Sequence, residues 1–225
     1  ILRRGKVVGS CTPREKSARE LAEMMVGQAL TPPERALLAT GEVALQVSGL
    51  SVTPSSGFGT SLKDLSFQVR KGEVLGIGGV AGNGQDELLL ALSGELRSPP
   101  GAVSILGRPV GNLGPNARRA AGLLTGPEER LGHAAAPDMS LLENALLTAE
   151  VRKSLTKRGF IDWPATRRFA EEIIKTFDVR TPGTQTAARA LSGGNLQKFV
   201  IGREILQKPA VIIVNQPTWG VDAAA

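Results

Sequence analysis

A short turn in the last third of the chain combines residue types that can hold a phosphate group. It consists of Ser192, Gly193, Gly194 and Asn195, and a stretch with helical periodicity follows it. A hydroxyl and two glycines at the start of a helix can present donors to an anion, and the helix dipole favours negative charge there. The alternative interpretation is that Ser192 only caps the helix. The turn therefore predicts a phosphate contact only together with other motifs.

Two amides follow the next apolar run of the chain. The run Val211–Val214 has no polar position, which predicts a buried parallel strand, and it leads into Asn215 and Gln216. An amide cannot accept a proton at neutral pH, so Gln216 cannot act as a general base. These two positions therefore offer hydrogen bonds without acid–base chemistry.

A second glycine-rich stretch has the spacing of a phosphate-loop motif. Residues 79–86 fit G-x-x-x-x-G-K-[ST] at both of its glycines, between a predicted strand and a predicted helix. Gln85 occupies the lysine position and brings no charge to a phosphate. Asp86 occupies the position of the magnesium-binding hydroxyl, which makes it a candidate Mg²⁺ ligand that adds negative charge beside an anion. The candidate nucleotide-binding residues here are Gly79, Gly82, Asn83, Gly84, Gln85 and Asp86.

The same glycines allow two other interpretations. Gly76, Gly78 and Ala81 fit the dinucleotide fingerprint G-x-G-x-x-A, with Glu95 close to the distance expected of a ribose contact. However, Glu95 follows a predicted helix and does not end a second strand. Alternatively, the loop is a structural turn that binds nothing, because the lysine is missing.

The composition is that of an ordinary globular protein. Of the 225 residues, 41% are hydrophobic and 21% charged, and no apolar run reaches the roughly 18–20 residues that cross a bilayer. The net charge is +6, but basic residues are dispersed among acids and no nucleic-acid-binding motif is present, so we expect no nucleic-acid partner. The single cysteine, Cys11, suits a reducing cytosol. Because the chain starts without Met or a signal peptide, we expect a fragment.

Changes in pattern divide the chain into three segments. Residues 1–28 predict a hairpin around Gly5 and an amphipathic helix over Ser17–Val26, residues 29–42 a linker, and residues 43–225 a second domain. In that domain we expect strands over 43–52, 65–69, 74–77, 103–106, 122–125 and 211–214, and helices over 85–93, 141–151, 164–177 and 193–206. Strands followed by helices indicate an α/β sheet, with an inserted helical segment near 128–180.

The turn at 192–195 and the strand with its amides together resemble the signature and Walker B regions of an ABC-transporter ATP-binding domain. The resemblance covers residues 41–225 and is strongest for the second ATP-binding domain of tandem importers for simple sugars and nucleosides. It rests on Gly-Asn-Gly-Gln at 82–85, Pro-Glu-Glu-Arg at 127–130 and Ser-Gly-Gly-Asn at 192–195. Residues 1–28 resemble the tail of the first domain of such a tandem.

The resemblance implies a P-loop NTPase-like α/β core with an antiparallel β subdomain and an inserted helical subdomain. It implies ATP and Mg²⁺ as cofactors, with residues 192–195 completing the nucleotide site of a second ABC domain. The chain's own site is expected to be degenerate and largely non-hydrolytic, because Gln85, Asn215 and Gln216 replace catalytic residues. Glu128 takes the Q-loop position.

Partners and location are implied in the same way. We expect a second ATP-binding domain, integral membrane permease subunits facing Glu128–Leu147, and, indirectly, a periplasmic or lipoprotein substrate-binding protein. The expected location is cytoplasmic, peripheral on the inner face of the plasma membrane. The alternative function is an inert dimerisation module that binds no nucleotide.

Three further residues have expected roles or places. Asp222 would be the D-loop residue that contacts the opposing domain, and Phe58 is a candidate for stacking on adenine. The chain ends at Ala225, before the family's switch histidine. His133 lies too early to replace that histidine, and we expect it in a surface loop.

Overall fold

The computed structural model describes residues 1–3, 5–27, 29, 39–54 and 59–218. These residues form two compact units, the first containing residues 1–3, 5–27 and 29 and the second residues 39–54 and 59–218. None of the described helices is both long and apolar enough to cross a membrane.

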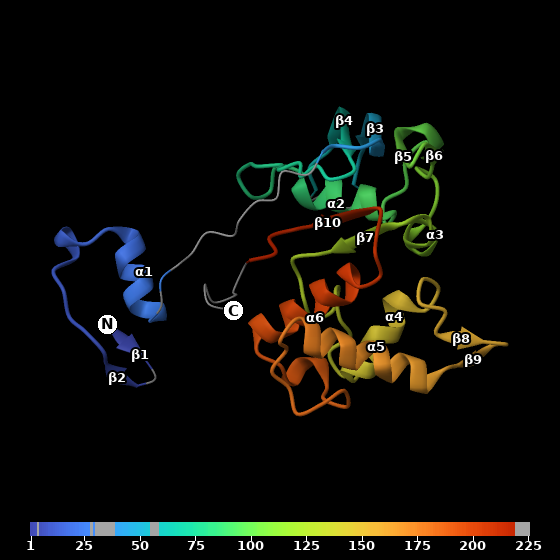
Figure 1. Cartoon of the computed structure of the whole chain (residues 1–225). Coiled ribbons are helices and arrows are strands. Elements are labelled where there is room, and N and C mark those ends of the chain that lie inside the picture. Colours follow the sequence, from blue (N-terminus) through green and yellow to red (C-terminus); the bar gives the residue numbers. More distant parts are fainter. Residues whose placement is uncertain (4, 28, 30–38, 55–58, 219–225) are drawn as a thin grey trace. The chain divides into compact units, whose positions relative to one another are not determined.

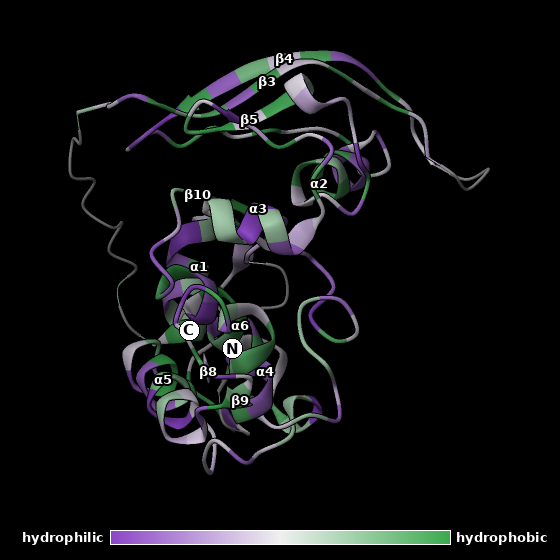
Figure 2. Ribbon diagram, turned by 90° about the vertical axis from the view of Figure 1, so that its right-hand side faces the viewer, coloured by the Kyte–Doolittle hydropathy of each residue, from purple (hydrophilic) through white to green (hydrophobic). Residues whose placement is uncertain are grey.

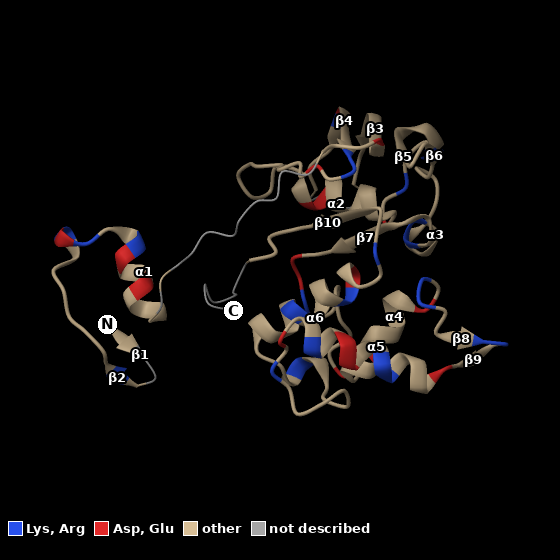
Figure 3. Ribbon diagram, in the orientation of Figure 1, with Lys and Arg blue, Asp and Glu red and all other residues tan. Residues whose placement is uncertain are grey.

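The first unit contains a hairpin and a capped helix (Figure 1). Strands β1 (Leu2–Arg3) and β2 (Lys6–Val7) pair antiparallel, and a 3-10 turn η1 (Pro13–Glu15) precedes helix α1 (Ala18–Val26). Ser17 and Glu20 form a capping box at the start of α1, and Gly27 ends the helix in a left-handed conformation with φ of 85°. Helix α1 carries charges of both signs (Figure 3), and Lys16, just before the helix, pairs with Glu20 at 2.9 Å. The predicted hairpin and helix are confirmed.

An antiparallel sheet begins the second unit. Its strand order is β4-β3-β5-β6, with bounds Val43–Val52 for β3, Leu62–Arg70 for β4, Val103–Ile105 for β5 and Arg108–Pro109 for β6. Hydrophobic and hydrophilic residues alternate along β3 and β4 (Figure 2), as expected of strands with one covered face. The predicted antiparallel pair is confirmed, although β4 begins at Leu62 rather than Leu65.

A parallel pair of strands and two helices pack against this sheet. Strands β7 (Leu123–Gly126) and β10 (Val211–Val214) pair in parallel, with Val211 beside Leu123. Helix α2 (Gln85–Ser93) lies between glycines at 84 and 94, both in left-handed conformations, and helix α3 (Pro115–Ala121) follows the 3-10 turn η2 (Pro100–Ala102) in the chain. Their shared core comprises buried residues of the sheet, α2 and β7, including Val47, Leu50, Leu92, Ile105 and Leu123.

The strand predicted over Val74–Ile77 is absent. The structure describes these residues without helix or strand, and Val74 is 95% exposed. A strand needs a hydrogen-bonded neighbour, and among the described strands only β7 pairs with β10. The strand predicted at 211–214 is parallel, as expected, but it is not buried on both faces, because Ile212 and Val214 remain 37% and 39% exposed.

The inserted segment is helical, as predicted, and has its own core. Helix α4 (Leu141–Ala149), the hairpin β8 (Thr156–Lys157) and β9 (Phe160–Ile161), helix α5 (Trp163–Thr176), the 3-10 turn η3 (Ala188–Ala190) and helix α6 (Gly193–Ile205) follow in order. Ser140 caps α4 with a second capping box, and Pro164 lies in the first turn of α5. The core contains Leu141, Phe169, Ile173 and Phe199.

A buried carboxylate connects this helical segment to α3. Glu204 of α6 accepts hydrogen bonds from Arg119 of α3 at 2.8 Å, from Thr148 of α4 at 2.9 Å and from its neighbour Arg203 at 2.8 Å. Burial alone would raise the pKa of Glu204, but the positive charges of Arg203 and Arg119 outweigh it and lower that pKa. The carboxylate is therefore charged inside the molecule.

Candidate functional site

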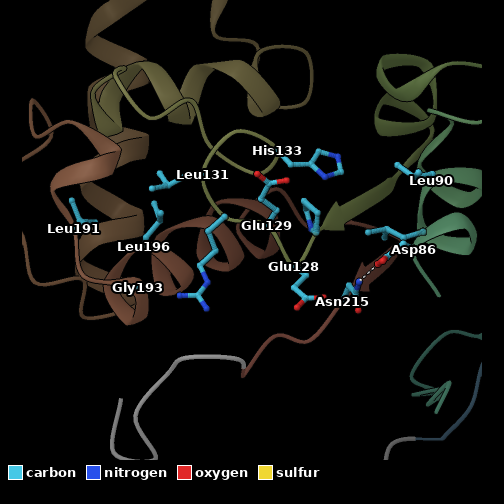
Figure 4. Close-up of a pocket in the computed structure, with 13 residues that line it drawn as sticks. Asp86, Leu90, Glu128, Glu129, Leu131, His133, Leu191, Gly193, Leu196 and Asn215 are labelled. Carbon is cyan, nitrogen blue, oxygen red and sulfur yellow. Dashed lines mark hydrogen bonds between the residues drawn. The ribbon is translucent and has the colours of Figure 1, made fainter. Parts of the chain in front are cut away.

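A cavity of about 660 Å³ lies where the start of α2, the segment after β7 and the start of α6 meet (Figure 4). Its lining residues come from these segments and from the end of β10: Asp86, Leu89, Leu90, Pro127, Glu128, Glu129, Arg130, Leu131, His133, Leu191, Gly193, Leu196 and Asn215. The fold therefore gathers Asp86, Glu128 and Asn215, expected at the chain's own site, around one space with Gly193, expected at the site of a second domain.

Asp86 and Asn215 are in direct contact. The side-chain amide of Asn215 donates a hydrogen bond from Nδ2 to Oδ1 of Asp86 at 2.9 Å. This contact joins the end of β10 to the first turn of α2, across 129 positions of the sequence. The candidate metal ligand therefore already has a neutral hydrogen-bond partner.

Glu128 and Gln216 form a second contact of the same kind. Nε2 of Gln216 donates to Oε2 of Glu128 at 3.2 Å. Gln216 has φ of 45°, in the left-handed region that non-glycine residues seldom adopt, and this turns its backbone sharply just after β10. Thus each of the two acids meets one of the two amides that the sequence placed after the strand.

The glycine-rich loop before α2 is filled by one of its own side chains. Oε1 of Gln85 accepts a hydrogen bond from the Asn83 N–H at 3.1 Å, and Nε2 donates to the Val80 carbonyl at 3.1 Å. Gly82 and Gly84 have φ of 86° and 102°, which only glycine adopts without strain. A Cβ atom on Gly79 would lie 2.6 Å from Nε2 of Gln85. The loop has the shape of a cradle, and the Gln85 carboxamide lies inside it.

These residues are a poor fit for Mg²⁺ and the phosphates of a nucleotide. The amide of Gln85 brings no charge to the cradle and already engages one of its N–H groups. The acid at position 86 repels phosphate and is engaged by Asn215. Gln216 itself cannot take a proton from water, and its amide donates a hydrogen bond to Glu128. The chain's own loop therefore offers a phosphate neither the lysine charge nor the hydroxyl of the phosphate-loop motif.

The turn at residues 192–195 is organised differently. Ser192 is exposed and has the backbone conformation of a helix cap, yet its side chain accepts no hydrogen bond from the first turn of α6. Instead its Oγ atom lies 2.9 Å from Nδ2 of Asn195, whose Oδ1 accepts from the Arg180 N–H at 2.8 Å. The first turn, with Gly193 and Gly194, therefore has N–H groups that no side chain caps. This end can present donors to an anion.

His133 lies in an exposed turn after β7, as expected of a surface-loop residue, but its side chain has a partner that was not predicted. Its side chain is 33% exposed, and Nε2 lies 3.0 Å from Oε2 of Glu95. Glu95 also accepts from Ser93 at 2.8 Å, just beyond the end of α2. The pair links the segment after β7 to α2, and single residues so distant in sequence carry no periodic signal that would have predicted it.

Two expected site residues lie outside the described part of the chain. Phe58 falls within 55–58, and Asp222 falls within 219–225. Their expected roles at adenine and at an opposing domain stay predictions.

A family model described as "ABC transporter" matches residues 62–219. The match spans more than half of the chain. The chain belongs to the ABC transporter family, in the part that binds ATP. The dinucleotide interpretation of Gly76, Gly78, Ala81 and Glu95 is thereby overturned.

Curated relatives of this chain are described as import ATP-binding proteins. The chain is 36% identical over 226 residues to "Guanosine import ATP-binding protein NupO" of Bacillus subtilis (strain 168), and the match covers 100% of this chain and 44% of the relative. It is 34% identical to "Nucleoside import ATP-binding protein NupA" of Lactococcus lactis subsp. cremoris (strain MG1363), with the same two coverages. It is 37% identical to "Ribose import ATP-binding protein RbsA 1" of Rubrobacter xylanophilus, again over 100% of this chain and 44% of the relative. The chain thus spans less than half the length of these relatives.

Solved structures agree on the fold. The dimeric post-hydrolysis state of the ATP-binding cassette MJ0796, bound to ADP and Pi, superposes with a TM-score of 0.63 at 22% identity, over 79% of this chain and 76% of that one. The cassette MJ1267 gives a TM-score of 0.60 at 21% identity, over 80% of this chain and 72% of that one. At these identities the likeness establishes the fold alone, and it confirms the expected α/β ABC ATPase core.

Proposed function

We propose that this chain is part of the ATP-binding subunit of an importer for simple sugars or nucleosides. Support comes from its relatives, which are described as import ATP-binding proteins for guanosine, nucleosides and ribose. In this proposal the subunit lies on the cytoplasmic, inner face of the plasma membrane against integral membrane permease subunits. Residues 128–147 face the permease, and a periplasmic or lipoprotein binding protein delivers the substrate.

Within that subunit, the chain acts mainly on a nucleotide held by a second ABC domain. Ser192, Gly193, Gly194 and Asn195 complete the second domain's ATP site, and the chain's own site is regulatory and largely non-hydrolytic. The observation that carries this division is that both acids of the chain's own site are engaged by amides, whereas the first turn of α6 is uncapped.

We expect the chain's own site to have lost most of its rate of ATP hydrolysis. Removing one charged or hydrogen-bonding stabiliser of a transition state commonly costs roughly 3–4 kcal/mol of barrier. Three such positions are altered here, at Gln85, Asn215 and Gln216. Even with strong non-additivity, the chain's own site should bind Mg-ATP weakly and turn it over very slowly.

Substitution in the assembled transporter tests this division. Ser192→Arg places a bulky cation where the second domain's nucleotide would lie, and we expect it to abolish transport-linked ATP hydrolysis. Gln85→Ala changes only the degenerate site, and we expect a modest change. Equal effects of the two substitutions would contradict the proposal.

A second candidate function is a dimerisation module that binds no nucleotide. The carboxamide of Gln85 inside the loop favours it, because a phosphate would have to displace that side chain. Calorimetric titration of the chain with Mg-ATP separates the two: micromolar binding excludes the inert module, and no heat up to millimolar ATP supports it.

A further inference from the structure

Helices α1, α4 and α6 each begin at a serine, and the third serine behaves differently. Ser17 and Ser140 each accept a hydrogen bond from the N–H of the third helical residue, which is a glutamate in both cases and closes a capping box. Ser192 has the same extended cap backbone, with φ of −63° and ψ of 154°, but caps nothing with its side chain. The third helical residue of α6 is Asn195. The difference therefore lies in the residue at this position.

The contacts of Asn195 determine which way its amide faces. The atom 2.8 Å from the Arg180 backbone nitrogen must be the acceptor oxygen Oδ1, because a backbone N–H can only donate. The other amide atom, 2.9 Å from Oγ of Ser192, is then the NH₂ group, which can only donate. Oγ of Ser192 is consequently an acceptor in this contact.

Two consequences follow for the start of α6. The oxygen of Ser192 is held by Asn195 and is kept from the N–H groups of the first turn. Its single hydrogen remains available to another acceptor, since the contact with Asn195 uses only an oxygen lone pair. The hydroxyl hydrogen and the uncapped N–H groups of the first turn thus stay available together.

We propose that Asn195 is a positioning residue: through Ser192 it keeps the start of α6 open and presents the serine hydroxyl as a donor to a phosphate. The phosphate belongs to the nucleotide of a second ABC domain, so the inference rests on the proposed function of this turn. The backbone of Arg180 supports the arrangement, because it fixes the amide orientation from a segment outside the helix.

Hydrogen exchange on the chain itself tests the arrangement without any nucleotide. In Asn195→Ala, Ser192 is released and becomes free to accept from the third N–H, as Ser17 and Ser140 do. A cap of this kind contributes about 1 kcal/mol, so exchange of the N–H at position 195 should slow about fivefold. Exchange of the Arg180 N–H should accelerate, because it loses its acceptor. Unchanged exchange at both positions would overturn the inference.

Kinetics of the assembled transporter test the consequence for the reaction. Asn195→Ala and Asn195→Asp both remove the side-chain NH₂, and each should lower kcat for ATP about tenfold or more while KM changes little. Asn195→Gln keeps an NH₂ group at the same helical position and should restore most of kcat. A structural role alone would not give this split between kcat and KM. Ser17→Ala, which removes an ordinary cap in the first unit, is the matched control and should leave kcat unchanged.

Comparison with Ser192→Ala distinguishes a failure of the positioning role of Asn195 from a failure of the proposed function. If Ser192→Ala lowers kcat but the Asn195 variants do not, the positioning role is wrong and the proposed function stands. If Ser192→Ala leaves kcat unchanged, the turn does not serve a second nucleotide site, and the proposed function fails together with its positioning residue.

Discussion

Arg118 is a fully buried cation without a carboxylate partner in its hydrogen bonds. Its guanidinium donates to the carbonyls of Ala91 and Leu92 at 2.6 and 2.9 Å, and to those of Leu113 and Gly111 at 3.0 and 2.6 Å. Two of these carbonyls belong to the last turn of α2, where the helix dipole favours a positive charge. Burial lowers the pKa of Arg118 to about 10, so the group remains charged at neutral pH.

Replacing this side chain should destabilise the second unit strongly. Arg118→Met fills similar space but leaves several carbonyls without donors, and we expect a loss of about 3–5 kcal/mol in the free energy of unfolding. Urea unfolding followed by circular dichroism measures it. Arg108→Met, at an exposed arginine of β6, is the control and should change stability by less than about 0.5 kcal/mol. Equal losses of unfolding free energy in the two variants would show that the hydrogen bonds of Arg118 do not stabilise the second unit.

At the scale of elements, the capping box of α1 has a measurable acid dependence. Hydrogen bonds from the Ser17 backbone, from Lys16 and from the Ser17 hydroxyl lower the pKa of Glu20 from its ordinary 4.5 to about 2. Because the folded pKa is the lower one, the stabilisation is complete above pH 4.5 and is lost as the pH falls through about 2.

This dependence predicts the result of a titration by nuclear magnetic resonance. The side-chain carboxyl of Glu20 should titrate near pH 2, and the helical signals of α1 should weaken over the same range. In Ser17→Ala the hydroxyl donor is lost, so the pKa of Glu20 should rise toward 4.5. If Glu20 titrated at its ordinary value in the unsubstituted chain, the hydrogen bonds of the cap would be contradicted.

Elements with local signals could be predicted from the sequence. Helix α2 has a glycine at each end, and α5 has Pro164 in its first turn. Apolar and polar residues alternate in β3. Each of these elements therefore carries a local signal in its own sequence. Residues 74–77 have strand-like composition but form no strand, because strand formation depends on a neighbour that composition does not encode.

The sequence indicated which residues belong to the candidate site, but not which of their side chains are in contact. The spacing of the motifs indicated Asp86, Glu128, Asn215 and Gln216 as site residues. That the acids would each meet an amide depends on how β10 packs beside α2 and the segment after β7, which no local pattern specifies. The same holds for the Arg180–Asn195 contact, which spans a loop and a helix.

For the second unit as a whole, Glu204 connects parts that have separate cores. Arg119 belongs to α3, whereas Thr148 and Arg203 belong to the helical segment, and all three donate to the same carboxylate. Glu204→Gln keeps the shape but leaves the buried Arg203 and the partly exposed Arg119 without their counter-charge. We expect a loss of roughly 3 kcal/mol or more, measured by urea unfolding, with the exposed Glu172→Gln as an almost neutral control.

The pH dependence of stability should change in the same variant. The folded pKa of Glu204 is lowered, so its contribution is present at neutral pH and is lost as the pH falls through that value. Glu204→Gln should therefore flatten the acid side of the stability profile. If the dependence of stability on pH kept its shape in Glu204→Gln, other carboxylates would be responsible for the loss of stability in acid.

The two acid–amide contacts have a mechanical consequence for the assembly. Acids that are bridged by a divalent cation separate when the cation leaves, whereas Asn215 and Gln216 hold Asp86 and Glu128 by covalently attached, uncharged donors. The junction of β10 with α2 therefore keeps its geometry in the presence of a chelator. Under the proposed function, the chain's own site would therefore keep its shape without a divalent cation.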